Sequence, residues 1–108
     1  MTEKTIEILG TEYRIEFKEL GNEECDAYCD PTERLIAVRE DNINEIGDFE
    51  ELQRRILRHE IIHAFLFESG LAFNWQHAEK FGHDETMVDW IAVQAPKIFK
   101  VFKELDII

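Results

Sequence analysis

The sequence predicts a single α+β domain, in which strands from the first half of the chain pack against helices from the second half. Three observations lead to this class. Residues 5–17 alternate polar and apolar side chains, residues 34–39 are rich in β-branched residues, and apolar residues recur at helical spacing after Asp48. No repeat, linker or low-complexity segment divides the 108 residues, so we expect one domain, 1–108, with one modest core.

Four short strands are expected before residue 40. Residues 5–9 and 12–17 alternate, and Gly10-Thr11 between them is typical of a two-residue hairpin turn. Residues 25–29 and 34–39 form the third and fourth candidates. The sequence therefore predicts a small, mostly antiparallel sheet of three to four strands.

Two helices are expected after the strands. Asp48 is a good N-cap, Glu51 completes a capping box, and Gly70 can adopt the left-handed conformation that ends a helix. Residues 71–82 are expected to form a loop or an irregular segment. A second helix is predicted over residues 84–95, and Pro96 is expected to kink or interrupt it. Helical spacing predicts three core residues in this second helix: Trp90, Ile91 and Val93.

The charge of the chain excludes two kinds of partner. Its 24 acidic and 12 basic residues give a net charge of −12, whereas nucleic acids and anionic membrane surfaces attract cationic proteins. The first residues contain no apolar segment of the kind found in signal peptides. We therefore expect a cytoplasmic protein without nucleic-acid or membrane partners, in which Cys25 and Cys29 are free thiols.

The motif that carries chemistry is His59-Glu60-Ile61-Ile62-His63, in the middle of the first predicted helix. His59 and His63 are four residues apart, so both project from one helical face, about 6 Å apart along the axis. Two imidazoles so placed can bind one Zn²⁺ at about 2.0–2.1 Å. Glu60 lies about 100° further round the helix and can reach a metal-bound water as a general base. The apolar residues around the motif favour a partly buried metal site over a solvated helix face with incidental histidines.

A catalytic zinc site requires a third protein ligand and one open position. Four residues after the motif are candidates for that ligand: His77, His83, Asp84 and Glu85. Glu85 and Asp89 share one face of the second predicted helix. One of these carboxylates could bind the metal and the other could accept a hydrogen bond from a ligand histidine.

HExxH followed by ExxxD on the next helix resembles the pattern of gluzincin zinc metallopeptidases, which include the thermolysin-like enzymes. The small size and the strands-first order resemble minigluzincins and small phage metallopeptidases. This resemblance implies His59, His63 and Glu85 as zinc ligands and Glu60 as the general base. It also implies that Asp89 orients a ligand histidine, with His59 as the expected partner.

The resemblance also implies how a substrate binds. An extended peptide would pair with an exposed sheet edge, which we take to be Leu35–Arg39. Leu66 and Ser69 stand where the longer metzincin signature has Gly and His, so a third histidine ligand in that register is excluded. Three residues are candidates by type for stabilising the oxyanion: Tyr28, His77 and His83.

The function expected from the sequence is that of a zinc-dependent metalloendopeptidase that hydrolyses a peptide or protein substrate with Glu60 as general base. Three alternatives remain open. The chain could be a non-enzymatic binding or accessory protein stabilised by zinc, for example of phage origin. It could be a metal-free interaction module. It could also be the same enzyme with His83 or Asp84 as third ligand in place of Glu85.

Overall fold

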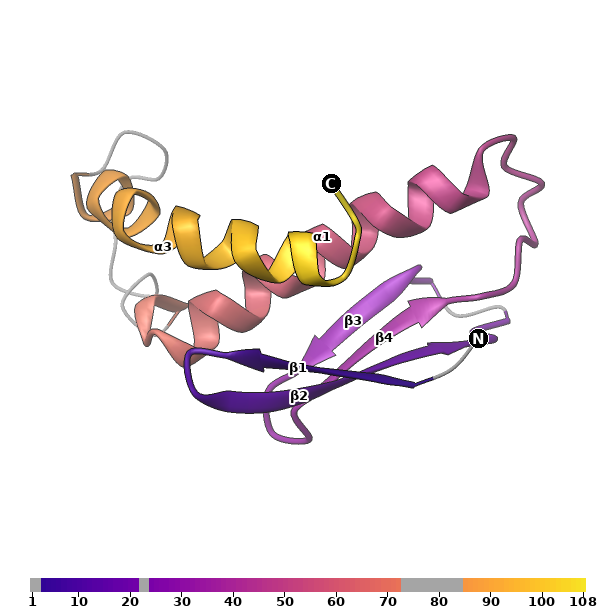
Figure 1. Cartoon of the computed structure of the whole chain (residues 1–108). Coiled ribbons are helices and arrows are strands. Elements are labelled where there is room, and N and C mark those ends of the chain that lie inside the picture. The colour runs from indigo at the N-terminus through magenta and orange to yellow at the C-terminus, as the bar shows by residue number, and fades with distance from the viewer. Residues whose placement is uncertain (1–2, 22–23, 73–84) are drawn as a thin grey trace.

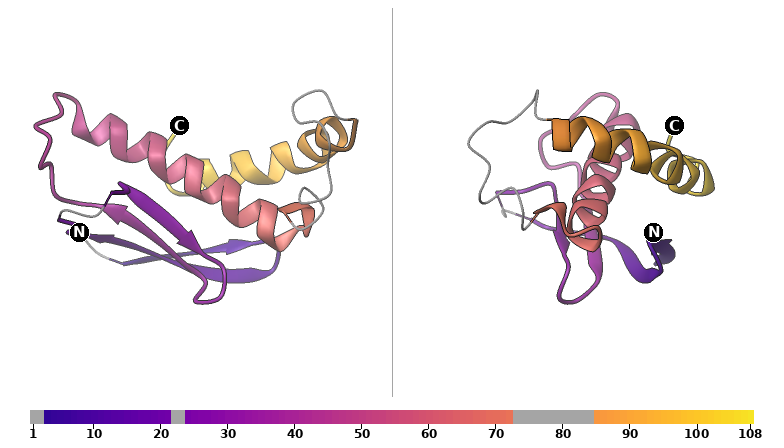
Figure 2. Two further views of the ribbon diagram at one scale, coloured as in Figure 1. Left: turned by 180° about the vertical axis from the view of Figure 1, so that it is seen from behind. Right: turned by 90° about the vertical axis from the view of Figure 1, so that its left-hand side faces the viewer.

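The computed structural model describes residues 3–21, 24–72 and 85–108, and it has the α+β architecture that the sequence predicts (Figure 1). The elements in chain order are β1 (Lys4–Ile8), β2 (Thr11–Lys18), β3 (Ala27–Asp30), β4 (Leu35–Arg39), α1 (Phe49–Glu68) and α3 (Glu85–Glu104). One four-stranded sheet forms one layer, and both helices lie on the same face of it, as the views from behind and from the side show (Figure 2). The expected loop over residues 71–82 lies almost entirely outside the described residues.

The order of strands in the sheet is β1-β2-β4-β3. Two of the three pairings are antiparallel, and β2 pairs with β4 in parallel. The prediction that Leu35–Arg39 forms the edge is therefore wrong, because β4 lies between β2 and β3. Ile36, Ala37 and Val38 of β4 are all 0% exposed, and an apolar strand covered on both faces belongs inside a sheet. The edges are β1 and β3.

The first hairpin turns one residue earlier than predicted. Ile8 pairs with Thr11, so the two turn residues are Leu9 and Gly10, with φ of 50° and 89°. Positive φ at both positions is the signature of a type I′ turn, whose twist matches that of the flanking strands. Gly10 adopts this conformation without strain. Leu9 adopts it because the pairing of Ile8 with Thr11 requires a two-residue turn. The third strand is also shifted, because β3 begins at Ala27 and excludes Cys25.

Helix α1 begins and ends where the sequence predicts. The Asp48 side chain accepts a hydrogen bond from the Glu51 backbone N–H at 3.1 Å. The capping box is only half formed, because the Glu51 carboxylate turns along the helix to Arg54 and Arg58 instead of back to Asp48. Gly70, with φ of 83°, follows the C-cap and takes the left-handed conformation that glycine favours there.

The core lies between the sheet and the two helices. Its central side chains come from four elements: Ile15 from β2, Ile36 and Val38 from β4, Ile61 and Phe65 from α1, and Val101 and Phe102 from α3. Ala27 and Cys29 of β3 pack against the same cluster. The HExxH helix is therefore held on the sheet by its apolar face, which leaves the opposite face open.

Helix α3 continues through Pro96 to Glu104, so Pro96, which is expected from the sequence to kink or interrupt the helix, does not interrupt it. A proline inside a helix costs about 3 kcal/mol because it removes a hydrogen bond and crowds the preceding turn. The burial of Ile98, Val101 and Phe102 just beyond it offsets that cost.

Two of the three core residues predicted for the second helix are exposed. Ile91 is 51% exposed and Val93 is 60% exposed. Trp90 is partly buried against the core, and its indole N–H donates a hydrogen bond to Ser69 Oγ at 2.8 Å. Because the helix packs mainly through its second half, its first half presents apolar residues to solvent.

Both helices carry charged residues along their length. Within residues 3–21, 24–72 and 85–108, no helix is long and apolar enough to cross a membrane.

A buried arginine fixes the segment before β3 to the sheet. Arg39, at the end of β4, is 3% exposed. Its Nε binds Asp26 Oδ1 at 3.0 Å and its Nη1 binds Asp41 Oδ2 at 2.8 Å. The same guanidinium donates to two backbone carbonyl oxygens, those of Gly21 and Cys25. This planar group therefore joins segments that precede β3 and follow β4.

Candidate metal centre

The two histidines of the motif meet on the surface of α1. One helical turn separates His59 and His63, and their Nε2 atoms are 3.1 Å apart. The ring centroids are 4.8 Å apart and the ring planes are inclined at 69°. His59 is exposed and His63 is half-buried, so the pair lies at the surface of the helix.

This pair fits two positions of a zinc site. An ion at about 2.0–2.1 Å from both Nε2 atoms would make an N–Zn–N angle of about 100°, close to the tetrahedral value. The side chains reach this geometry with α1 in its regular helical form, so binding would not require the helix to unwind. The same separation also suits a hydrogen bond between two neutral imidazoles, in which one nitrogen donates and the other accepts.

Glu60 projects towards the sheet rather than into solvent. It is 9% exposed, and it faces Cys29 on β3 closely enough for its charge to act on that thiol. Burial, together with the negative charges of Glu60, Asp30 and Glu68, raises the pKa of Cys29 to about 12. The general base predicted by the motif therefore lies at the boundary between α1 and β3.

The raised pKa of Cys29 predicts unequal reactivity of the two free thiols. At pH 8 we expect iodoacetamide to modify the exposed Cys25 first. Cys29 should react roughly a thousandfold more slowly than an ordinary thiol, because a pKa of about 12 leaves little thiolate. Mass spectrometry of the alkylated peptides measures both rates.

The raised pKa of Cys29 also determines how this thiol affects the folding stability as the pH changes. The folded-state pKa of Cys29 exceeds that of the unfolded chain, so its contribution to stability is present below about pH 8.5 and is lost as the pH rises towards 12. Replacing Glu60 by Gln removes a nearby negative charge and should speed the alkylation of Cys29. Equal rates for Cys25 and Cys29 in the folded wild-type protein at pH 8 would contradict this account.

Strand β3 lies beside α1 and forms the edge of the sheet nearest the motif (Figure 1). Its only neighbour among the described strands is β4. Ala27 and Cys29 face the core under α1, so by the alternation of a strand Tyr28 faces the other side of the sheet. There the Lys18 ammonium lies 5.3 Å from the centre of its ring. Tyr28, one of the candidates for the oxyanion, therefore lies on the face of the sheet away from α1.

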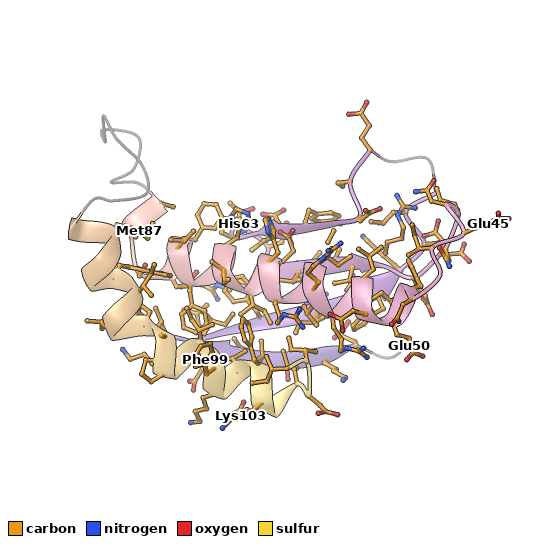
Figure 3. The ribbon with its side chains drawn as sticks, turned by 90° about the horizontal axis from the view of Figure 1, so that it is seen from above. Glu45, Glu50, His63, Met87, Phe99 and Lys103 are labelled. Atoms are coloured by element: carbon orange, nitrogen blue, oxygen red, sulfur yellow. The ribbon has the colours of Figure 1, made fainter. Side chains whose placement is uncertain are left out.

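The structure leaves the third ligand untested. Glu85 is the first residue of α3 and Asp89 follows one turn later, but their side chains lie outside the described part of the chain, as do His77, His83 and Asp84. Among the described residues, no group of three or more His, Cys, Asp or Glu side chains is placed to hold a metal ion. Figure 3 shows Met87 beside the C-terminal end of α1 and His63 nearer its middle.

Sequence reasoning missed a polar contact that fixes the end of the motif helix. Tyr13 Oη and Thr11 Oγ1 donate hydrogen bonds to Glu68 Oε2 and Oε1 at 2.7 and 2.8 Å. Burial, together with the bond to this carboxylate, raises the pKa of Tyr13 above its usual value. A glutamate at a helix C-terminus opposes the helix dipole and needs a partner, which is the one signal in the sequence that points to this contact.

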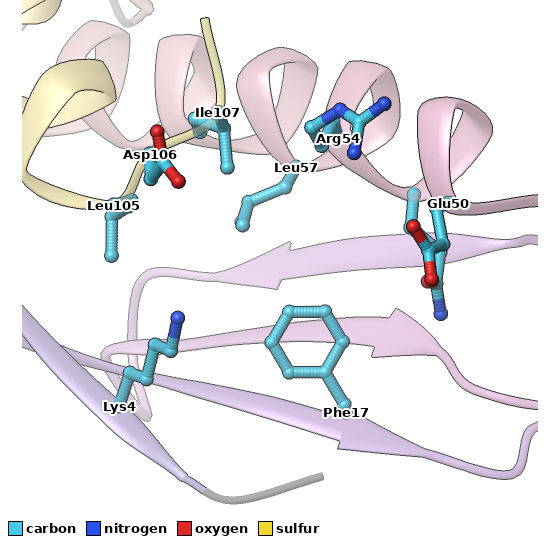
Figure 4. A pocket seen from close by; sticks show the side chains of 9 residues that line it. Lys4, Phe17, Glu50, Arg54, Leu57, Leu105, Asp106 and Ile107 are labelled. Atoms are coloured by element: carbon cyan, nitrogen blue, oxygen red, sulfur yellow. The ribbon is translucent and has the colours of Figure 1, made fainter.

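A cavity of about 240 Å³ opens between the sheet, the first turns of α1 and the C-terminal segment (Figure 4). Phe17 from the sheet and Leu57 from α1 line it from opposite sides (Figure 4). Two cations and two anions also line it: Lys4, Arg54, Glu50 and Asp106. None of the motif residues lines this cavity, so it has no part in the candidate metal centre.

Comparison with models of known protein families, with curated proteins and with solved structures gives no match. The function of the chain is therefore argued from the residues and geometry of the candidate metal centre.

Proposed function

We propose that the chain is a zinc-dependent peptidase. The observation that carries this proposal is the convergence of the His59 and His63 Nε2 atoms, 3.1 Å apart, on a helix in which the adjacent Glu60 is buried towards an edge strand. Two imidazole ligands and a neighbouring carboxylate are the minimum that metal-assisted hydrolysis requires from one helix.

Each residue of the motif has a distinct role in this proposal. His59 and His63 would hold the ion, and Glu85 from the start of α3 is the proposed third ligand. A bound zinc ion would supply Lewis acidity, which lowers the pKa of water and polarises a carbonyl group. The Glu60 carboxylate accepts a proton from the attacking water and returns it to the leaving amine. Burial beside Cys29 shields Glu60 from bulk water, which strengthens its interaction with a charged centre.

The edge strand β3 is the proposed docking site for the substrate backbone. An extended peptide could add to the outer edge of Ala27–Asp30 by main-chain hydrogen bonds. We propose β3 for this role in place of Leu35–Arg39, because β4 lies between two other strands and has no free edge. Backbone pairing would orient a peptide along α1, beside the histidine pair.

The first test is the metal content of a His63→Ala variant. We expect about one zinc per wild-type chain, and no zinc in the variant, because His59 and the proposed ligand Glu85 would be one protein ligand short of a catalytic zinc site. Elemental analysis of the purified proteins measures both. Arg55→Ala is the matched control, since Arg55 is an exposed residue two turns earlier on the same helix. Zinc retained by His63→Ala would overturn the assignment of the metal centre.

The burial of Glu60 favours one second candidate, a zinc-stabilised protein without catalysis. A base that is 9% exposed is largely closed to substrate in this conformation. In that case chelation would lower the unfolding temperature, and the zinc-loaded chain would leave a library of unstructured peptides intact. Cleavage of any peptide that depends on both zinc and Glu60 would exclude this candidate.

A further inference from the structure

An apolar groove runs between α1 and α3 on the side away from the sheet. All nine side chains that line it are apolar or Trp, and it encloses about 290 Å³. Ile62 and Leu66 form the α1 wall, and Met87, Ile91 and Phe99 are among the residues of the α3 wall. Figure 3 shows Met87 and Phe99 along α3 in this view from above.

Side chains of the same groove also project into solvent. Ile62 is 40% exposed, Ile91 51% and Phe99 55%. A contiguous apolar surface of this kind on a small domain marks an interaction site. The groove therefore offers both a depression and projecting apolar side chains, which lets this surface be complementary to a second copy of itself.

The distribution of charge indicates which partner fits. Helices α1 and α3 together carry six basic and seven acidic residues, so almost all of the net charge of −12 lies on the rest of the chain. Two copies that met through their sheets and loops would bring like charges together. Two copies that met through their helices would bury apolar surface and keep the acidic regions apart. A cationic partner, in contrast, would be attracted to the sheet and loops rather than to this groove.

We propose that the α1–α3 groove is the contact surface of a symmetric homodimer. Ile91 and Phe99 of each copy pack into the groove of the other, next to Ile62. A contact made by a few apolar side chains of each copy belongs to the weaker class of interfaces. The histidine pair lies on the neighbouring surface of α1, so the proposal is independent of whether the chain hydrolyses peptides.

Sedimentation velocity of the full chain between about 1 and 100 μM tests the proposal. We expect a concentration-dependent shift from one chain to two. The double variant Ile91→Glu/Phe99→Glu should weaken dimerisation by about a hundredfold or more, because it would bury carboxylates in an apolar contact. Ile62→Glu, on the other helix, should have the same effect. Circular dichroism confirms that each variant is folded, as expected for replacements of exposed side chains.

Val93→Glu is the matched control. Val93 is 60% exposed on α3 but does not line the groove, so this variant should dimerise like the wild type. Raising the salt concentration should strengthen the dimer, because it screens repulsion between two acidic chains. The proposal is overturned if the wild type is monomeric throughout the range, if Val93→Glu disrupts the dimer equally, or if salt dissociates it.

Discussion

Replacing Glu60 by Gln is expected to reduce peptide hydrolysis by about a hundredfold to ten-thousandfold and to leave the bound zinc in place. The range is that of a positioned general base. Gln has the size of Glu and keeps a hydrogen-bonding oxygen, but it cannot accept the proton of the attacking water. Because Gln fits the buried position of Glu60 and the proposed ligands His59 and His63 are unchanged, the substitution should remove the base and keep the metal ligands. Cleavage of an unstructured peptide pool and zinc content are measured on the same samples.

Glu50→Gln is the control for this experiment. Glu50 is an exposed glutamate in the first turn of the same helix, so its neutralisation changes the net charge equally and should leave activity unchanged. Two outcomes would remove Glu60 from its proposed role. One is hydrolysis at the wild-type rate in Glu60→Gln, and the other is loss of zinc from that variant.

Replacing Arg39 by Leu is expected to destabilise the fold by about 3 kcal/mol, a large part of the stability of a small domain. Arg39 is buried, and its guanidinium binds Asp26, Asp41 and two backbone carbonyls. Leu would leave these acceptors without their donor. The loss of the ion pair costs more at Asp41 than at Asp26. The Asp41 side chain is 15% exposed, whereas the Asp26 side chain is 46% exposed and water can replace the lost donor. The midpoint of urea unfolding measures the effect.

Arg14→Leu is the matched control for Arg39→Leu. Arg14 also lies on a strand, but its side chain is 43% exposed and it forms an ion pair with Glu16, which is itself 27% exposed. A surface pair of this kind contributes less than about 1 kcal/mol. A midpoint for Arg39→Leu equal to that of Arg14→Leu would show that the buried guanidinium is not required for stability.

The motif helix illustrates how much of the fold is encoded locally. Its start at Asp48 and its end before Gly70 follow from the conformational preferences of single residues, and the structure agrees with both. The alternation of β1 and β2 likewise predicts a hairpin, although the turn falls at Leu9 because a type I′ turn fixes the register. These features depend on interactions within a few residues, which a sequence displays directly.

The errors concern contacts between distant segments. Pairing of β4 with β2 moves Leu35–Arg39 from the edge to the interior of the sheet. Packing of the second half of α3 carries the helix through Pro96 and leaves Ile91 in solvent. The edge position of Leu35–Arg39 is implied by the family resemblance, whereas the expectations for Pro96 and Ile91 follow from local helix preference and spacing. Tertiary burial decided them, because it contributes more free energy than a single turn or helix preference.

The geometry of the candidate metal centre also has a part that follows from the local sequence and a part that depends on tertiary packing. The sequence by itself determined that His59 and His63 share one helical face, because the 3.6-residue period fixes that relation in any helix. It also determined that Glu60 lies beside them. Only the tertiary structure decided that Glu60 is buried against β3, that β3 is the edge next to the motif, and that Tyr28 faces the other side of the sheet. These relations depend on how the sheet and α1 bury their apolar faces together, which is a property of the whole chain rather than of any segment.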